Sequence, residues 1–282
     1  MDAPLINPAF LLLQTASRDA LERMARPRLG DEDVHEARKA IKKARSALRL
    51  LRPVLGDGDY RQQNAALRDA GQCLSALRDA RILLTTIETF AADPDLTPHA
   101  PDIARLRRSV EKRLSAARER LGSAEARQRC TGLVEAVRVH LGRQELAQAG
   151  TQAMQDGLAK IYRKARAAFT QACEVNSAEN LHEWRKQTKH LRAAAAALQP
   201  LAASALHGCE KTARDLSDWL GDDHDLAVLR DYVRDGELVS ADAARAIIDR
   251  IEARRAKLQH KAFAAGKELF ARKPKRFVAN AL

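Results

Sequence analysis

The amino-acid sequence predicts an all-α protein that is built as two four-helix bundles. Three observations support this prediction. The 282 residues are rich in alanine, leucine and arginine, which favour helices, and only 4% of them are aromatic. Apolar residues recur at helical spacing along most of the chain, without the alternation that is typical of strands. A stretch near residue 35 also returns near residue 182, which indicates two similar halves.

The first half is predicted to hold four helices, over residues 7–26, 34–52, 60–91 and 102–146. The first of them ends at Pro27 and Gly30, because proline and glycine stop helices. The second ends near Pro53, before a glycine-rich turn at residues 56–58. A loop from Asp93 to Pro101 separates the two long helices that follow.

The second half repeats this order, with helices predicted over residues 152–173, 180–200, 202–235 and 240–272. The third of these is predicted to be interrupted or bent at Gly221, because glycine weakens a helix. A short connection over residues 147–151 joins the halves. We therefore expect a first bundle over residues 1–148 and a second over residues 149–282.

Two copies of one basic stretch organise the chain. Residues 34–52 and 181–195 align at a constant offset of 147 residues, so that His35 matches His182 and Arg38 matches Arg185. At about 100° per residue, the cationic side chains of each copy share one face of a helix, and apolar side chains occupy the other. Each copy is therefore predicted to pack on one side and to present a dense row of positive charge on the other.

The positive charges of these two helices lack acidic partners in the sequence. No acidic residue follows Glu36 before Asp57, and none follows Glu183 before Glu210. Like charges three and four residues apart destabilise a helix unless an anion neutralises them. Because the pattern occurs twice, we interpret it as an anion-binding surface and not as an ordinary solvated face.

Each copy also begins with a capping signal, formed by the pairs Asp33–Glu36 and Asn180–Glu183 at N-cap to N3 spacing. This assigns the two glutamates to capping and not to catalysis. It places His35 and His182 in the first helical turn, where free N–H groups favour an anion. We expect both histidines to strengthen anion binding as the pH falls from about 8 to about 6.

The overall charge agrees with a polyanionic partner. Lysine and arginine outnumber aspartate and glutamate by 49 to 37, and the net charge is +12. Nucleic acid, polyphosphate and an anionic membrane surface are all consistent with this charge. The four cysteines form no C-x-x-C pair, so neither a zinc site nor a disulfide framework is expected. No segment approaches the roughly 20 apolar residues that span a bilayer, and we expect a cytoplasmic protein.

The paired motif H-E-x-R-K-x-x-K-[KH]-x-R resembles the CHAD domain (conserved histidine alpha-helical domain), and the resemblance covers essentially the whole chain. It implies two four-helix bundles related by a pseudo-two-fold axis. It also implies binding of inorganic polyphosphate in a basic cavity along that axis, association with polyphosphate granules, and no catalysis. The implied polyphosphate-binding residues are His35, Arg38, Lys39, Lys42, Lys43, Arg45, Arg49, Arg163, Arg166, His182, Arg185, Lys186, Lys189, His190 and Arg192.

Two other functions remain open at this stage. A basic helical protein could bind nucleic acid, although few aromatic residues are present for base stacking. A polyphosphate or triphosphate hydrolase would require an acid/base pair or a metal site. The Asp222–Asp225 segment is the best candidate for such a site, but its four adjacent side chains point in different directions on a helix. We therefore predict a structural role for it, with Asp225 buried and paired, and expect no metal or cofactor.

Overall fold

The computed structural model describes residues 6–282 apart from residues 28, 123, 143 and 202. These described residues form α-helices and short 3-10 turns and no strand, so the all-α prediction is confirmed. In the first half the helices are α1 (Pro8–Met24), α2 (Asp31–Leu50), α3 (Arg52–Cys73), α4 (Ser75–Ala91), α5 (Ala100–Gly122), α6 (Ala124–His140) and α7 (Gln144–Ala147). The others are α8 (Thr151–Glu174), α9 (Ala178–Leu198), α10 (Ala203–Asp235), α11 (Ala241–Leu269) and α12 (Pro274–Ala281).

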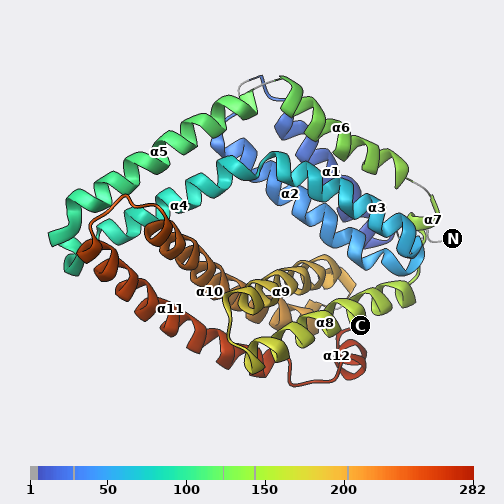
Figure 1. Cartoon of the computed structure of the whole chain (residues 1–282). Helices are drawn as coiled ribbons and strands as arrows, with labels where there is room; N and C mark the ends of the chain where they lie inside the picture. Colours follow the sequence, from blue (N-terminus) through green and yellow to red (C-terminus); the bar gives the residue numbers. More distant parts are fainter. Residues whose placement is uncertain (1–5, 28, 123, 143, 202) are drawn as a thin grey trace.

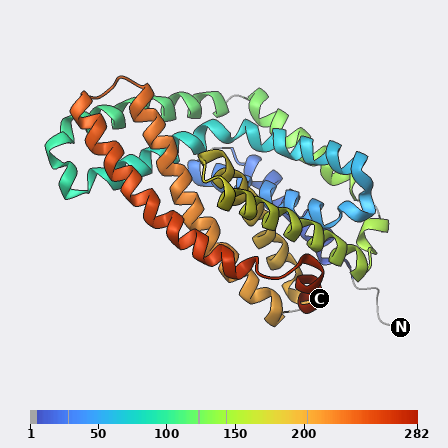
Figure 2. The same ribbon diagram turned by 60° about the horizontal axis from the view of Figure 1, so that its bottom comes forward.

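The helices pack in two connected groups. In the first half α1, α2, α3 and α6 contact one another, and α4 packs on α5. In the second half α9 lies between α8 and α10, and α11 packs on α10. The halves meet in two places, where α2 contacts α8 and α9 and where α4 contacts α10 (Figures 1 and 2). The division into two bundles at residue 148 stays a prediction.

The first half contains more breaks than the sequence predicts. The helix expected over residues 60–91 is two helices, α3 and α4, which meet at Leu74 with φ −100° and ψ 4°. The guanidinium of Arg38 donates a hydrogen bond to the carbonyl oxygen of Gly71, with Nη1 and O 2.6 Å apart. A side chain that inserts into the helical ladder takes up a carbonyl that the next turn would otherwise use, and this produces a kink. The helix expected over residues 102–146 is likewise divided, into α5, α6 and α7.

The second half shows the opposite difference, because α10 runs through Gly221 without interruption. Gly221 lies next to the guanidinium of Arg185. A Cβ at position 221 would lie 3.6 Å from both Nε and Nη2 of Arg185, which is an ordinary van der Waals distance. Arg185 itself is buried, with 8% of the residue exposed.

Packing between tilted aromatic rings holds α9 in the second half. Trp184 is completely buried and packs against Phe169 of α8 and Phe263 of α11, with ring centroids 5.1 Å and 5.3 Å away. Gly266 lets the rings approach, because a Cβ there would lie 2.6 Å from the indole. The apolar face predicted for residues 181–195 is therefore buried, and the cationic face is left turned toward α2. No helix in the described part of the chain is long and apolar enough to cross a membrane.

Candidate functional site: a basic cavity between α2 and α9

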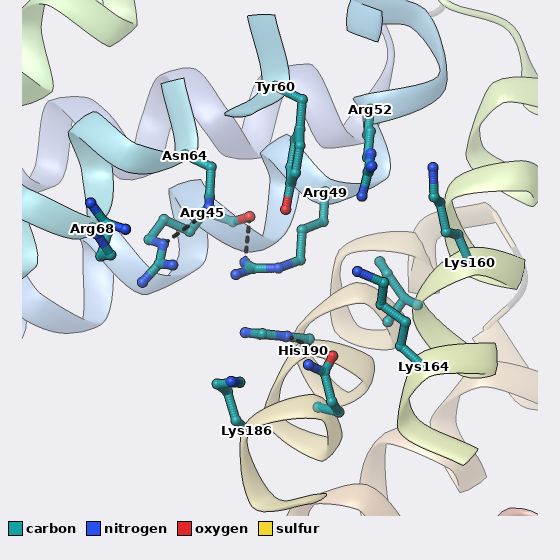
Figure 3. A pocket seen from close by; sticks show the side chains of 12 residues that line it. Arg45, Arg49, Arg52, Tyr60, Asn64, Arg68, Lys160, Lys164, Lys186 and His190 are labelled. Atoms are coloured by element: carbon teal, nitrogen blue, oxygen red, sulfur yellow. Dashed lines mark hydrogen bonds between the residues drawn. The ribbon is translucent and has the colours of Figure 1, made fainter. Parts of the chain in front are cut away.

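The two basic helices face each other and border a cavity of about 470 Å³. Figure 3 shows side chains of α2, α3, α8 and α9 reaching into it. Seven arginine and lysine side chains line it, and no acidic residue of the described chain does. The lining consists of Arg45 and Arg49 from α2, Arg52, Tyr60, Asn64 and Arg68 from α3, Lys160, Ile161 and Lys164 from α8, and Lys186, Gln187 and His190 from α9.

A close crossing of α2 and α8 places the lysines of α8 in this cavity. A Cβ at Gly157 would lie only 2.5 Å from the carbonyl oxygen of Leu50, so only glycine permits this approach. Lys160 and Lys164 follow one and two turns later on the same side of α8. Burial, and then the charges of Arg52 and Lys160, lower the pKa of Lys164. The crossing therefore adds cations from a third helix.

Hydrogen bonds hold the arginines of the cavity in place. Arg45 donates from Nε to Oδ1 of Asn64 (3.2 Å), and Arg49 donates from Nη1 to the carbonyl oxygen of Arg45 (2.7 Å). Arg52 pairs with Asp57 (2.8 Å), and its guanidinium also lies 4.6 Å from the centre of the Tyr60 ring. Burial lowers the pKa of Arg49 to about 10. The other guanidinium donors of these residues have no hydrogen-bond partner among the described residues and can bind an anion.

A second group of five cations, here called the central cluster, lies next to the cavity where α2, α4 and α9 converge. Its members are Arg38 and Lys42 of α2, Arg78 of α4, and Arg185 and Lys189 of α9. The Nε atoms of Arg38 and Arg185 are buried and have no hydrogen-bond partner among the described residues. These two arginines occupy matching positions in the sequence repeat. A buried donor without a partner is energetically costly. An anion that accepts a hydrogen bond from these Nε atoms would remove that cost.

The lysines of the central cluster are strongly perturbed. Burial, and then the charges of Arg78, Arg38 and Arg185, lower the pKa of Lys42 to about 8. Burial, and then the charges of Arg185, Lys42 and Arg78, lower the pKa of Lys189 to about 7. Burial and the cluster's charges lower the pKa in both cases because they disfavour the ammonium form. The protein thus concentrates more positive charge here than its own carboxylates balance.

Two histidines border the central cluster. The Nδ1 atoms of His182 and His224 lie 3.3 Å apart, which joins α9 to α10. Burial lowers the pKa of His224 to about 4 and also lowers the pKa of His182. His182 lies in the second turn of α9, because Ser177 and not Asn180 is the N-cap. The N-cap of α2 is likewise Gly30, with Asp33 at N3, so the first-turn positions predicted for His35 and His182 are wrong.

The predicted binding residues divide between the two cationic sites and other places. Arg45, Arg49, Lys186 and His190 line the cavity, and Arg38, Lys42, Arg185 and Lys189 belong to the central cluster. Lys186 also pairs with Glu183. Lys39 pairs with Glu36 (2.7 Å) and lines a separate pocket of mixed charge, as Lys43 does. His35 and Arg163 are exposed, Arg166 donates to the carbonyl oxygen of Phe270 (3.0 Å), and Arg192 pairs with Glu210 (3.1 Å).

Several cationic residues of these sites were missed in the sequence. Arg52 and Arg68 lie outside the repeated motif, and Lys160 and Lys164 lie one turn apart on α8, where Arg163 and Arg166 were predicted instead. Arg78 of α4 lies outside both basic stretches, residues 34–52 and 181–195, and belongs to the central cluster. For the two lysines of α8, Gly157 is the sequence feature that could have identified them, because a glycine marks the face of a helix that closely approaches another helix.

The Asp222–Asp225 segment differs from its prediction in one respect. Asp223, and not Asp225, is the buried, paired residue. It accepts hydrogen bonds from Arg255 Nε (3.0 Å) and Gln259 Nε2 (2.7 Å) and so links α10 to α11. Asp225 is half-buried beside the central cluster, and burial raises its pKa. Within the described chain no group of three or more His, Cys, Asp or Glu side chains could hold a metal ion.

Comparisons with known proteins support one family. The model of the CHAD domain family matches residues 12–234 of this chain. The crystal structure of the CHAD domain from the plant Ricinus communis is similar over 96% of this chain and 93% of that chain, with a TM-score of 0.67 and 18% identity. At this identity the likeness establishes the fold alone. No curated protein matches the sequence.

Proposed function

The chain belongs to the CHAD domain family, and on that premise we propose that it binds inorganic polyphosphate in its basic cavity without turning it over. The observation that supports this most directly is the cavity lining, with seven arginine and lysine side chains and no acidic residue among the described ones. Arginine can hold phosphate oxygens through two parallel hydrogen bonds, and lysine neutralises them as a point charge. The two halves, residues 1–148 and 149–282, would each supply one wall.

The shape of the site favours a thin polyanion. A concave space between facing helices concentrates positive potential. A flexible phosphate chain can enter it, whereas duplex DNA, rigid over about 150 base pairs, could touch only the rim. Single-stranded nucleic acid needs stacking surfaces, and Tyr60 is the one aromatic side chain among the described lining residues, with Arg52 already over its ring. This proposal implies that the protein is located in the cytoplasm, on polyphosphate granules.

Competition between polyanions tests the proposal. We expect long-chain polyphosphate to displace a labelled polyphosphate at far lower phosphate concentration than single-stranded RNA or duplex DNA, because only the first fits the cavity without stacking. The measurement is fluorescence anisotropy at physiological salt, with equal phosphate concentrations. Binding should weaken steeply as salt rises, since released counterions contribute to it. Equal competition by duplex DNA would instead indicate a surface that binds nucleic acid.

Turnover is tested separately. We expect no release of orthophosphate at a catalytic rate when the protein is incubated with long-chain polyphosphate and Mg²⁺, because no group of three or more His, Cys, Asp or Glu side chains among the described residues could hold a metal ion that activates a water molecule. A phosphate-release assay over several hours measures this. Asp225 is the half-buried carboxylate next to the central cluster. If orthophosphate accumulates, and Asp225→Asn stops it, the protein is a hydrolase and the binding proposal is wrong in that respect.

A further inference from the structure

The ammonium groups of Lys42 and Lys189 have no hydrogen bond or ion pair among the described residues, although both lie in the central cluster. The charged and titratable groups that act on them come from helices α2, α4, α9 and α10. These are Arg38 from α2, Arg78 and Asp79 from α4, Arg185 from α9, and His224 and Asp225 from α10. Arg78 already bonds Asp79 (3.0 Å). The positive groups around the two lysines therefore outnumber the carboxylates that could balance them.

This surplus has a consequence for the protons of the two lysines. Surrounding protein atoms and repulsion from Arg38, Arg78 and Arg185 favour the neutral amine in both lysines. Lys189 is half-buried and loses the more hydration, whereas Lys42 is exposed, so the repulsion by neighbouring cations is its more secure cause. A bound phosphate chain would bring several negative charges next to them. It would replace the repulsion by attraction and restore the ammonium form.

We propose that Lys42 and Lys189 take up protons when a phosphate chain enters the central cluster, so that proton uptake is part of binding. This rests on the proposed function. The two lysines then act as an adjustable part of the site's charge, and the arginines act as its fixed part, because guanidinium groups stay protonated. A cell compartment that becomes more acidic would hold the chain more tightly, and one that becomes more alkaline would release it.

The direction and the size of the change in affinity with pH follow from the linkage between proton binding and phosphate binding. The bound state keeps both protons and the free state loses them as pH rises through about 7 for Lys189 and about 8 for Lys42, so affinity is highest below these values and falls above them. From about pH 6 to about pH 8.5 we expect affinity to fall roughly a hundredfold. At about pH 7.5 we expect uptake of about one proton for each site filled.

The three histidines beside the cationic sites do not account for this pH range. Burial lowers the pKa values of His182, His190 and His224, so these three titrate at lower pH than the two lysines do. A bound anion favours their protonated form, which would further raise the affinity for the anion below about pH 6.5. The sequence-based expectation that His35 and His182 strengthen binding between about pH 8 and about pH 6 stays a prediction, and the proposal adds Lys42 and Lys189 to it.

Calorimetric titration with long-chain polyphosphate tests the proposal. Long chains are used because they have few terminal groups that titrate. Each titration is run at constant ionic strength from about pH 6 to about pH 8.5, in two buffers of different ionisation enthalpy, so that the heat difference reports protons. In the wild-type protein we expect the hundredfold loss and the proton uptake. In the double variant Lys42→Arg, Lys189→Arg we expect a nearly flat pH profile and uptake close to zero, because arginine stays charged.

Matched variants keep this test specific. Lys39→Arg makes the same exchange one turn before Lys42, at a lysine that pairs with Glu36 outside the cluster, and should keep the wild-type profile. His182→Gln should keep the pH slope above about pH 7. A wild-type profile that is flat, or a double variant as steep as wild type, overturns the proposal while binding itself stands. Absence of binding at every pH contradicts the proposed function instead. Circular dichroism confirms that each variant is folded.

Discussion

Polyphosphate binding is expected to disappear, with the helices intact, when four cations of the central cluster are replaced by alanine: Arg38, Lys42, Arg185 and Lys189. Each hydrogen bond to a charged phosphate oxygen contributes about 1.5–3 kcal/mol, so the loss of four groups should weaken binding more than a thousandfold, to about the limit of measurement. The measurement is the dissociation constant for long-chain polyphosphate at about pH 7 and physiological salt. The cavity next to the cluster keeps its own cations and would retain only weak binding.

The fold should tolerate this change. The four side chains repel one another, and Lys42 and Lys189 have no ion pair among the described residues, so their removal relieves like-charge repulsion. Loss of the hydrogen bond from Arg38 to the carbonyl oxygen of Gly71 opposes this gain, so we expect a melting temperature close to that of the wild-type protein. A control variant with the same loss of net charge replaces four exposed lysines of α5, α10 and α11 that lie outside both sites: Lys112, Lys211, Lys257 and Lys261. It should bind within about threefold of wild type at physiological salt, because distant exposed charges are screened. Equal affinities of the two quadruple variants would refute the central cluster as part of the binding site.

The largest effect on stability is expected from Asp223→Ala. Asp223 and Arg255 form an ion pair whose side chains are 3% and 6% exposed. Removal of one partner of a buried pair leaves the other charge uncompensated and typically costs about 3–5 kcal/mol. Glu252 still pairs with Arg255 in the variant (3.0 Å), so we expect the lower end of this range. For a chain of this size, a loss of about 3 kcal/mol lowers the melting temperature by roughly 6–12 °C.

Thermal or urea denaturation measures this effect, and the adjacent Asp222 provides the control. Asp222 is exposed and has no hydrogen bond among the described residues. Asp222→Ala should therefore change stability by less than about 0.5 kcal/mol. If Asp223→Ala proves as stable as Asp222→Ala, the pair between α10 and α11 contributes nothing. The α10–α11 contact would then depend on apolar packing alone.

Helical periodicity predicts a large part of the site, because the period decides which side chains share a face. Arg38, Lys42, Arg45 and Arg49 are spaced by three or four residues, and all of them reach one of the two cationic sites. The periodicity alone does not give the width of that face. Lys39 and Lys43 lie just beyond its edge, where α1 covers α2 and supplies the acidic residues of the separate pocket.

The rest of the site depends on tertiary contacts that leave little trace in the sequence. The rotation of α8 is set where Gly157 meets Leu50, and that rotation selects Lys160 and Lys164 over Arg163 and Arg166. The break at Leu74 depends on a side chain from another helix, Arg38, whose insertion no local pattern indicates. The apolar periodicity continues through residues 74–84, so the sequence predicts one helix where the structure has two.

The ring cluster around Trp184 makes the second half optically distinct from the first. The chain has two tryptophans, Trp184 in α9 and Trp219 in α10, and both lie after residue 150. Tryptophan emission therefore reports only on the second half, whereas far-ultraviolet circular dichroism reports on helices throughout. The two signals will coincide during denaturation where the halves lose structure together and will separate where they do not. Trp184 lies on the buried face of α9, the helix that also carries Arg185 and Lys189. Its emission therefore also reports whether α9 stays packed in the core when the binding site changes.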